Sequence, residues 1–200
     1  MEPDAHLIER RLGGRTLLSG GFLEVHKDDV RLPDGTTATR EYIRHGGAVA
    51  VIALLDEGPD TRLVMVRQYR YPTGKVLLEI PAGKLDPGET QLACAMRELR
   101  EETGYSAAEW AFCTEIHNAA AYSSESIWIW LARGLVPGPA RPDRGEFVET
   151  VNCSLAELEA LEARGELPDV KTQVALFRLL RAQATDHAWP WRPAGELAAL

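Results

Sequence analysis

Apolar and polar residues alternate in two short runs within the first 45 positions. The runs are residues 16–32 and 36–45, and the turn sequence Pro33-Asp34-Gly35 separates them. This pattern predicts strands joined in a hairpin. We therefore expect residues 1–45 to form a small antiparallel β appendage.

From residue 46 onward the pattern of apolar and polar residues changes. Residues 48–55, AVAVIALL, form a continuous apolar run that suits a strand covered on both faces. Further strands are predicted at residues 62–68, 75–83, 110–117, 126–132 and 146–153. Because segments of helical spacing accompany these runs, we expect one α/β domain over residues 46–185. Residues 186–200 have no clear period and are expected to form a tail.

Two helices are predicted near the end of this domain. Ser154 and Glu157 have the spacing of a capping box, which opens a helix over residues 154–165. Residues 169–185 also show helical spacing. The apolar side of this second helix is expected to consist of Val170, Val174, Phe177 and Leu180.

A further helix is predicted within residues 83–105. Its core-facing stripe is expected to be Leu92, Met96 and Leu99, which recur at i, i+4 and i+7. Asp86 resembles an N-terminal cap, although the pattern also allows a start as late as Gln91. Gly104 fits the position just past the last turn, where a left-handed residue ends a helix.

Three glutamates crowd one side of this helix. At 100° per residue, Glu98, Glu101 and Glu102 fall within about 100° of arc. Like charges at these spacings each cost roughly 0.2–0.5 kcal/mol, and carboxylates near the helix end also oppose its dipole. Two interpretations follow: a solvated face on which Arg97 pairs with Glu101, or a set of oxygen ligands for a hard cation such as Mg²⁺ or Mn²⁺.

Composition narrows the classes of function. The chain has 200 residues, 45% of them hydrophobic, and a formal net charge of -8, which disfavours binding to nucleic acid. An anionic small molecule would need a local cation to reverse this field. Three cysteines without a CxxC pair suggest neither a disulfide framework nor a zinc site, and we expect a reduced, cytoplasmic location. No apolar run reaches the length of a membrane span or a signal peptide, so no membrane partner is expected.

The glutamates lie within a longer spaced pattern. It consists of Gly83, five residues, Glu89, seven residues, and then Arg97-Glu98-Leu99-x-Glu101-Glu102-x-Gly104-Tyr105. This stretch resembles the Nudix box, GX5EX7REUXEEXGU with U apolar, at every position. The resemblance implies an α/β/α sandwich around a mixed sheet, and metal-dependent hydrolysis of a nucleoside diphosphate linked to another moiety.

The resemblance also implies roles for individual residues. The metal ligands would be Glu98 and Glu102, with Glu101 beside them and the backbone carbonyl of Ala82 as a further ligand. Glu89 and Arg97 would form a pair that fixes loop against helix, and Gly83 would let the loop backbone approach the metal and phosphates. Bridging metal ions would polarise the phosphorus and activate a bound water.

Residues 66–89, VRQYRYPTGKVLLEIPAGKLDPGE, are similar to the block that precedes the box in ADP-ribose pyrophosphatases. In that subfamily the N-terminal appendage makes a swapped homodimer, and both subunits contribute to the substrate site. By match, Arg70 would contact the substrate, Arg40 would reach it from the partner chain, and Glu125 would supply a polar contact.

Two departures from the subfamily bear on substrate and catalysis. Ala120 stands where the subfamily usually has proline, which keeps GDP-mannose or another nucleotide sugar open as the alternative substrate. The acidic loop that supplies the general base is represented by residues 143–149. Glu146 is the preferred candidate to position or deprotonate the water, followed by Glu149, with Glu101 as the candidate within the box. A Nudix-fold module that senses a nucleotide without hydrolysing it is the alternative outside the enzyme class.

Overall fold

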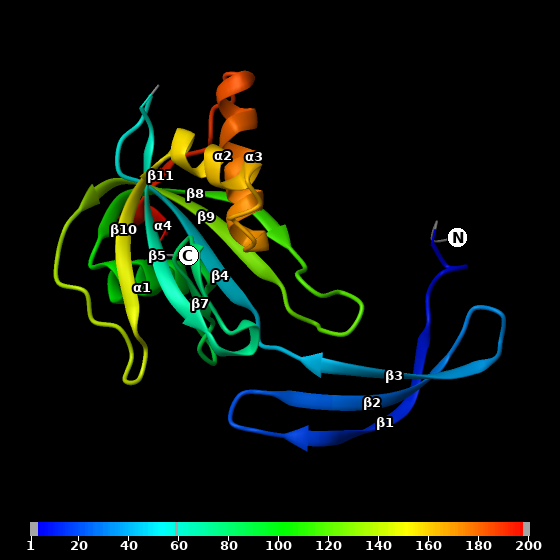
Figure 1. The fold of residues 1–200 in the computed structure, drawn as a ribbon. Helices are drawn as coiled ribbons and strands as arrows, with labels where there is room; N and C mark the ends of the chain where they lie inside the picture. The colour runs from blue at the N-terminus through cyan, green and yellow to red at the C-terminus, as the bar shows by residue number, and fades with distance from the viewer. Residues whose placement is uncertain (1–3, 59, 198–200) are drawn as a thin grey trace. The chain divides into compact units, whose positions relative to one another are not determined.

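The computed structural model describes residues 4–58 and 60–197, and two compact units are present in it. Residues up to Gly47 form the smaller unit together with His117–Ser126. Ala48–Ile116 and the chain after Ile127 form the larger unit. Figure 1 shows the elements of both units.

The smaller unit is an antiparallel sheet of three strands, as the alternation predicts. Its strands are β1 (Arg10–Ser19), β2 (Glu24–Arg31) and β3 (Thr37–Arg44), paired in the order β1-β2-β3. Gly35 adopts φ 86° in the turn between β2 and β3, where the N–H of Thr36 donates to Asp34 Oδ1 at 2.9 Å. The Pro-Asp-Gly turn is therefore confirmed.

The loop that joins strands β8 (Ser106–Ile116) and β9 (Ile127–Val136) belongs to the smaller unit. The N–H of Ile43 donates to the carbonyl of Tyr122 at 2.8 Å, and the N–H of Ser124 donates back to the carbonyl of Ile43 at 2.9 Å. Residues 117–126 are thus attached to the end of β3 by backbone hydrogen bonds. Ala120 lies in an exposed turn of this loop.

The larger unit is built on one mixed sheet. Its strands are β4 (Ala48–Leu54), β5 (Arg62–Arg70), β6 (Lys75–Glu79), β7 (Ala82–Lys84), β8 (Ser106–Ile116), β9 (Ile127–Val136), β10 (Val148–Ser154) and β11 (Arg192–Pro193). The main order is β10-β5-β4-β9-β8-β11, with β6 paired to β5 and β7 paired to β4. The β4–β9 pair is parallel and the other pairs are antiparallel.

Strand β4 lies at the centre of the core, and every residue of it is buried. Its alternating side chains enter two different hydrophobic clusters. Val49 and Val51 pack in one cluster with helix α1 (Gln91–Thr103). Ala50 and Ile52 pack in the other with α2 (Leu155–Ala163) and α3 (Val170–Ala184). The sheet therefore lies between two helical layers, which confirms the α/β/α sandwich predicted from the sequence (Figure 1).

The predicted capping box opens helix α2. Ser154 Oγ accepts from the N–H of Glu157 at 3.2 Å, while Glu157 Oε2 accepts from the N–H of Ser154 at 2.7 Å. A 3-10 turn over Tyr71–Thr73 separates β5 from β6. The capping box could be predicted from the sequence because Ser154 and Glu157 lie three residues apart.

The predicted apolar face of α3 is confirmed for Val174 and Leu180, which pack against the core, and wrong for its other two residues. Val170 and Phe177 are 49% and 57% exposed, whereas Ala175, Leu176 and Leu179 are buried. Polar residues at the start of the helix are buried with them, namely Lys171 and Thr172. The sequence pattern failed here because these polar side chains find partners inside the larger unit, so apolar periodicity alone did not mark the inward side.

The segment after α3 contributes to the edge of the large sheet. Strand β11 pairs with β8 through Arg192 and Trp110, and helix α4 (Ala194–Leu197) follows it. Trp189 and Trp191 pack against the core, and the guanidinium of Arg133 lies 4.3 Å from the ring centroid of Trp191. The segment is ordered by aromatic packing and two rungs of pairing, signals too short to show a period in the sequence.

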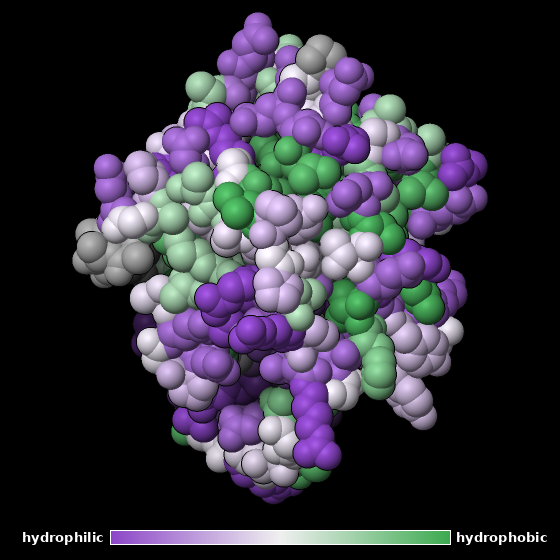
Figure 2. Space-filling model, turned by 90° about the vertical axis from the view of Figure 1, so that its left-hand side faces the viewer, coloured by the Kyte–Doolittle hydropathy of each residue, from purple (hydrophilic) through white to green (hydrophobic). Residues whose placement is uncertain are grey.

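The surface mixes charged and apolar side chains. Figure 2 shows hydrophilic residues over most of one face, with hydrophobic residues in smaller groups between them. Within residues 4–58 and 60–197, no helix is long and apolar enough to cross a membrane.

Candidate functional site

Helix α1 and the strand β7 before it provide the backbone frame of the candidate site. Thr90 caps the helix, and its Oγ1 accepts from the N–H of Ala93 at 3.3 Å. Asp86 is therefore not the cap, and the later start at Gln91 is the one observed. Gly104 ends the helix with φ 78°, as predicted.

The carboxylates of α1 are less solvated than their sequence pattern indicates. Glu98 and Glu102 are only 9% and 2% exposed, while Glu101 is half-buried. Leu92 and Leu99 are buried as predicted. Because a buried carboxylate needs a compensating cation, this burial argues against a simple solvated face.

Arg97 links the loop before the helix to the glutamates of the helix. It donates to both carboxylate oxygens of Glu89, at 2.9 and 2.8 Å, and to the carbonyl of Lys84 at 3.0 Å. It also donates to Glu98 at 2.7 Å and to Glu101 at 3.0 Å. The hydrogen bonds from Arg97 lower the pKa of Glu89 to about 2.

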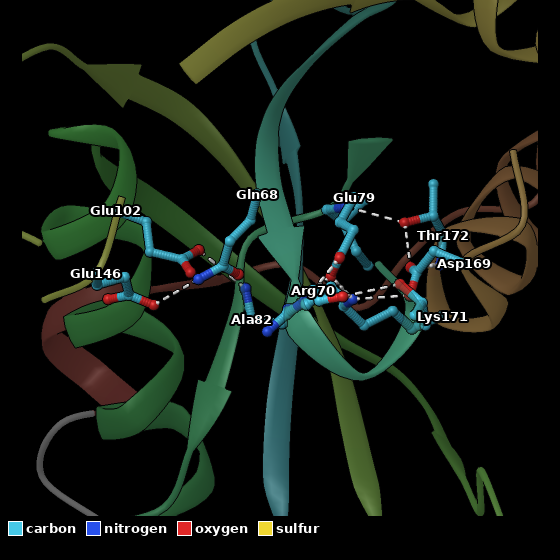
Figure 3. A network of polar contacts seen from close by, with 11 residues as sticks. Gln68, Arg70, Glu79, Ala82, Glu102, Glu146, Asp169, Lys171 and Thr172 are labelled. Atoms are coloured by element: carbon cyan, nitrogen blue, oxygen red, sulfur yellow. Dashed lines mark hydrogen bonds and ion pairs between the residues drawn. The ribbon is translucent and has the colours of Figure 1, made fainter. Parts of the chain in front are cut away.

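Glu102 is the most deeply buried carboxylate of the box. Its Oε2 accepts from the N–H of Ala82 at 3.0 Å, and no described cationic side chain pairs with it (Figure 3). Burial, together with the nearby charges of Glu98 and Glu146, raises the pKa of Glu102 to about 8. These three carboxylates therefore repel one another across a small region.

Glu98 lies directly against the backbone of Gly83. Burial raises the pKa of Glu98, and the nearby Glu101 and Glu146 add to this effect, whereas Arg97 opposes it. A Cβ atom at position 83 would overlap the Glu98 carboxylate. Glycine is required here for close approach, as the sequence comparison with the box implies.

The two candidate bases of the later acidic segment have different surroundings. Glu146 Oε1 accepts from Gln68 Nε2 at 3.1 Å, and its carboxylate is on the same side as Glu102 (Figure 3). Glu149 is exposed and pairs with Arg67 at 2.7 Å across the β5–β10 ladder. Only Glu146 is electrostatically coupled to the box carboxylates.

Arg70 lies at the end of β5, on the other side of Ala82 from Glu102 (Figure 3). Its Nε and Nη2 donate to the two oxygens of Glu79 at 2.8 and 2.7 Å. Glu79 also accepts from Lys171, which pairs in turn with Asp169 at 2.9 Å. Glu79 and Lys171 were not predicted from the sequence as parts of the site. The sequence feature that could have indicated them is a charged residue within the strand pattern of residues 75–83 and another within the helical pattern of residues 169–185.

The remaining candidates, Arg40 and Glu125, belong to the smaller unit. Arg40 Nε donates to Glu9 at 2.9 Å. The Glu125 carboxylate lies 3.7 Å from His45 Nε2. The larger unit alone brings together Ala82, Glu98, Glu102, Glu146 and Arg70.

The donor set of the site suits a hard divalent cation. It offers carboxylate oxygens with no cysteine or histidine, and their mutual repulsion and burial are what a cation would relieve. Among the described residues, no group of three acidic, histidine or cysteine side chains is arranged for coordination. In the structure Glu98 and Glu101 accept hydrogen bonds from Arg97.

Two domain families match the chain, in agreement with its division into a small sheet and a sandwich. The NUDIX domain matches residues 44–174, and the nucleoside diphosphate sugar hydrolase N-terminal domain matches residues 9–43. The chain therefore belongs to the NUDIX family, whose hydrolases generally need a divalent metal.

Relatives and a solved structure agree with this assignment. The chain is 37% identical over 181 residues to a methanol dehydrogenase activator of Bacillus methanolicus, covering 90% of this chain and 96% of that protein. It is 36% identical over 180 residues to an ADP-ribose pyrophosphatase of Bacillus subtilis (strain 168), covering 89% and 96%. A crystal structure of an ADP compounds hydrolase has the same fold, with a TM-score of 0.78 at 24% identity over 90% of this chain and 97% of that one.

Proposed function

We propose that the protein hydrolyses the pyrophosphate bond of ADP-ribose or a related nucleoside diphosphate sugar, giving a nucleoside monophosphate and a sugar phosphate. The observation that carries this proposal is the group of mutually repelling carboxylates beside Arg70, in which Glu98 and Glu102 are buried and Glu146 is partly exposed. Such a group suits a divalent cation that in turn neutralises a diphosphate. The names of the Bacillus subtilis relative and of the matching N-terminal domain support the choice of substrate class.

Each residue of the site has a proposed part in this reaction. Glu98, Glu101, Glu102 and the carbonyl of Ala82 would hold Mg²⁺ or Mn²⁺. The bound metal supplies charge neutralisation of the diphosphate and acidification of water. Glu146, which accepts a hydrogen bond from Gln68, positions the attacking water and accepts its proton. It is preferred over Glu149 because its charge acts on the box carboxylates and it is not paired with an arginine.

The remaining contacts act on geometry and charge. Arg70 binds the diphosphate through the edge of its guanidinium that Glu79 leaves free. Glu89 and Arg97 hold the β7–α1 loop against the helix, so that Gly83 stays close to Glu98. Arg40, reaching from the partner subunit, and Glu125 are proposed to contact the substrate.

A steady-state comparison of nucleotide sugars tests the substrate. We expect the highest kcat/KM for ADP-ribose among ADP-ribose, ADP-glucose and GDP-mannose, with Mg²⁺ or Mn²⁺ present and with EDTA as the metal-free control. The alanine at position 120 motivates the GDP-mannose arm. Release of no phosphomonoester from any of them, in either metal, would overturn the proposal and favour a nucleotide sensor.

We also propose that residues 1–45 form a dimerisation element and residues 46–185 the catalytic domain; residues 186–200, expected from the sequence to form a tail, extend this domain through the pairing of β11 with β8. The exposed apolar side chains of the small sheet, Leu12, Leu17 and Leu18, support the first of these assignments. We propose that the protein is a homodimer. We also propose a cytoplasmic location, which agrees with the free thiols of Cys94, Cys113 and Cys153. Sedimentation equilibrium at micromolar concentration, compared with a Leu17→Glu/Leu18→Glu variant, tests the dimer.

A further inference from the structure

The first turn of helix α3 buries a lysine that its packing does not require. Lys171 is buried among the apolar residues that face the sheet, next to Thr172. Burying an ammonium group costs several kcal/mol unless it is paired and hydrogen-bonded. A methionine or leucine would fill the same volume without that cost, so the charge itself needs an explanation.

Lys171 is paired with two carboxylates, and one of them is almost completely buried. Its Nζ donates to Asp169 Oδ1 at 2.9 Å and to Glu79 Oε2. Asp169 is itself fixed as the cap of α3, because its Oδ2 accepts from the N–H and the Oγ1 of Thr172 at 2.9 and 2.6 Å. Lys171 therefore connects a rigid helix terminus to the Glu79 carboxylate.

Glu79 in turn holds Arg70 in one orientation. The two hydrogen bonds from Nε and Nη2 form a bidentate pair, which fixes the plane of the guanidinium. Within the described part of the chain, Arg70 Nη1 has no hydrogen-bond partner, and the Arg70 side chain is 39% exposed. The guanidinium is thus anchored on one edge and open on the other.

The charges of this network favour an anionic ligand at the open edge. If Glu79 were paired with Arg70 alone, its negative charge would largely cancel that of the arginine. Lys171 pairs with both Glu79 and Asp169, so the two cations and two carboxylates of the network sum to zero charge; without Lys171, the remaining three groups would carry a net charge of -1, which opposes an anionic ligand at Arg70. The pairing with Lys171 also makes Glu79 less free to move with Arg70 when a ligand binds.

The same turn fixes the backbone that leads to the box. Thr172 Oγ1 accepts from the N–H of Ile80 at 2.9 Å, two residues before Ala82. Figure 3 shows the network running from α3 through Glu79 to Arg70, with Ala82 and Glu102 beyond. The turn of residues 169–172 thus contacts both the residue that holds Arg70 and the strand end next to it.

We propose that Lys171 is a positioning residue for substrate binding: through Glu79, it orients Arg70 and preserves the positive charge that Arg70 presents to the diphosphate. This inference rests on the proposed function, since it takes Arg70 as a substrate contact. Lys171 itself touches no reacting atom. It acts on the affinity for the diphosphate through Glu79 and Arg70, and Arg70 lies 101 positions earlier in the sequence.

A double-mutant cycle separates this role from a merely structural one. Lys171→Met is measured in the wild-type protein and in Arg70→Ala, with ADP-ribose and Mg²⁺. We expect Lys171→Met to raise KM about tenfold while kcat changes less than about threefold, and to raise KM less than about twofold when Arg70 is already absent. Lys171→Arg, which keeps the charge, should recover most of the affinity.

Controls exclude changes in stability and in net charge. Arg164→Met removes the same charge from an exposed ion pair with Glu166, and we expect its KM to match the wild type. Circular dichroism melting verifies folding of every variant. If Lys171→Met does not fold, Lys171→Gln carries the same comparison, since it removes the charge but keeps a hydrogen-bond donor.

The possible failures are distinguishable. An unchanged KM in Lys171→Met, or an equal rise in the presence and absence of Arg70, overturns the positioning role while leaving the enzyme assignment intact. A wild-type protein that hydrolyses no nucleotide sugar overturns the proposed function, and this inference with it.

Discussion

Arg97 donates a 2.7 Å hydrogen bond to Glu98, the residue that follows it in helix α1. Neighbouring residues on a helix do not normally face each other, so this contact requires the arginine to curve over the glutamate. The same guanidinium also clamps Glu89. Arg97 therefore offsets the negative charge of Glu98 and of Glu89 at once.

Replacement of Glu102 should separate catalysis from stability. We expect Glu102→Gln to lower kcat by about 10²–10³-fold, since a metal ligand is lost. Without added metal the variant should be no less stable at neutral pH, because burial raises the pKa of Glu102 to about 8 and the amide replaces a carboxyl that is mostly uncharged there. The rise in Tm on adding Mg²⁺ or Mn²⁺ should shrink in the variant. Activity assays and thermal melts with metal or EDTA check both parts.

Glu159→Gln is the matched control, because Glu159 is an exposed glutamate of another helix. It should leave kcat and the metal-induced rise in Tm unchanged. Wild-type turnover in Glu102→Gln would show that Glu102 is not needed for metal binding.

The pair Glu146 and Glu149 distinguishes the base from a strand-edge carboxylate. Glu146→Gln should lower kcat by about 10²–10³-fold with little change in KM, because loss of a general base acts on the chemical step. Glu149→Gln should cost less than about threefold, since it removes only an exposed ion pair with Arg67. Single-turnover kinetics of the two variants provide the comparison, and equal losses would contradict the assignment.

Gly83 should be required for the position of Glu98. Gly83→Ala places a methyl group where the Glu98 carboxylate lies, so the side chain must move away. Because the displaced atoms are the end of a flexible side chain, we expect a small loss of stability but at least a tenfold weaker response to metal. Gly46→Ala is the control, since a Cβ at position 46 meets no atom within 4 Å. Metal titrations of activity compare the two, and equal midpoints would contradict the role of Gly83.

Much of the fold followed from patterns that act locally. The buried run of β4, the capping box at Ser154 and the turn at Gly35 were predicted because propensity and burial agree there. The start of α1 was bracketed, and Thr90 proved to be its cap.

The parts that could not be predicted depend on partners far apart in the chain. Lys171 faces inward because Glu79, 92 residues away, neutralises it, and apolar periodicity could not predict this buried lysine in the first turn of α3. Likewise, spacing placed the glutamates of α1 on one side but did not reveal that Glu102 is buried against Ala82. Such burial depends on the loop packing of the folded chain rather than on helical period.

The Glu89–Arg97 pair predicts how the stability of the fold decreases at acidic pH. A folded-state pKa of about 2, below the unfolded value near 4.5, means that ionised Glu89 stabilises the fold above about pH 4.5. This contribution is lost as the pH falls from about 4.5 to 2. Solvent partly screens the Glu89–Arg97 pair, so we expect its contribution to the free energy of unfolding to be on the order of 2 kcal/mol, less than the full pKa shift would give. In EDTA, Glu89→Gln should therefore be less stable than wild type at pH 6, and the difference should close towards pH 2. Urea unfolding at several pH values measures this convergence, with Glu159→Gln as the control. A constant difference across the range would show that the ionised carboxylate of Glu89 is not what holds the loop to the helix.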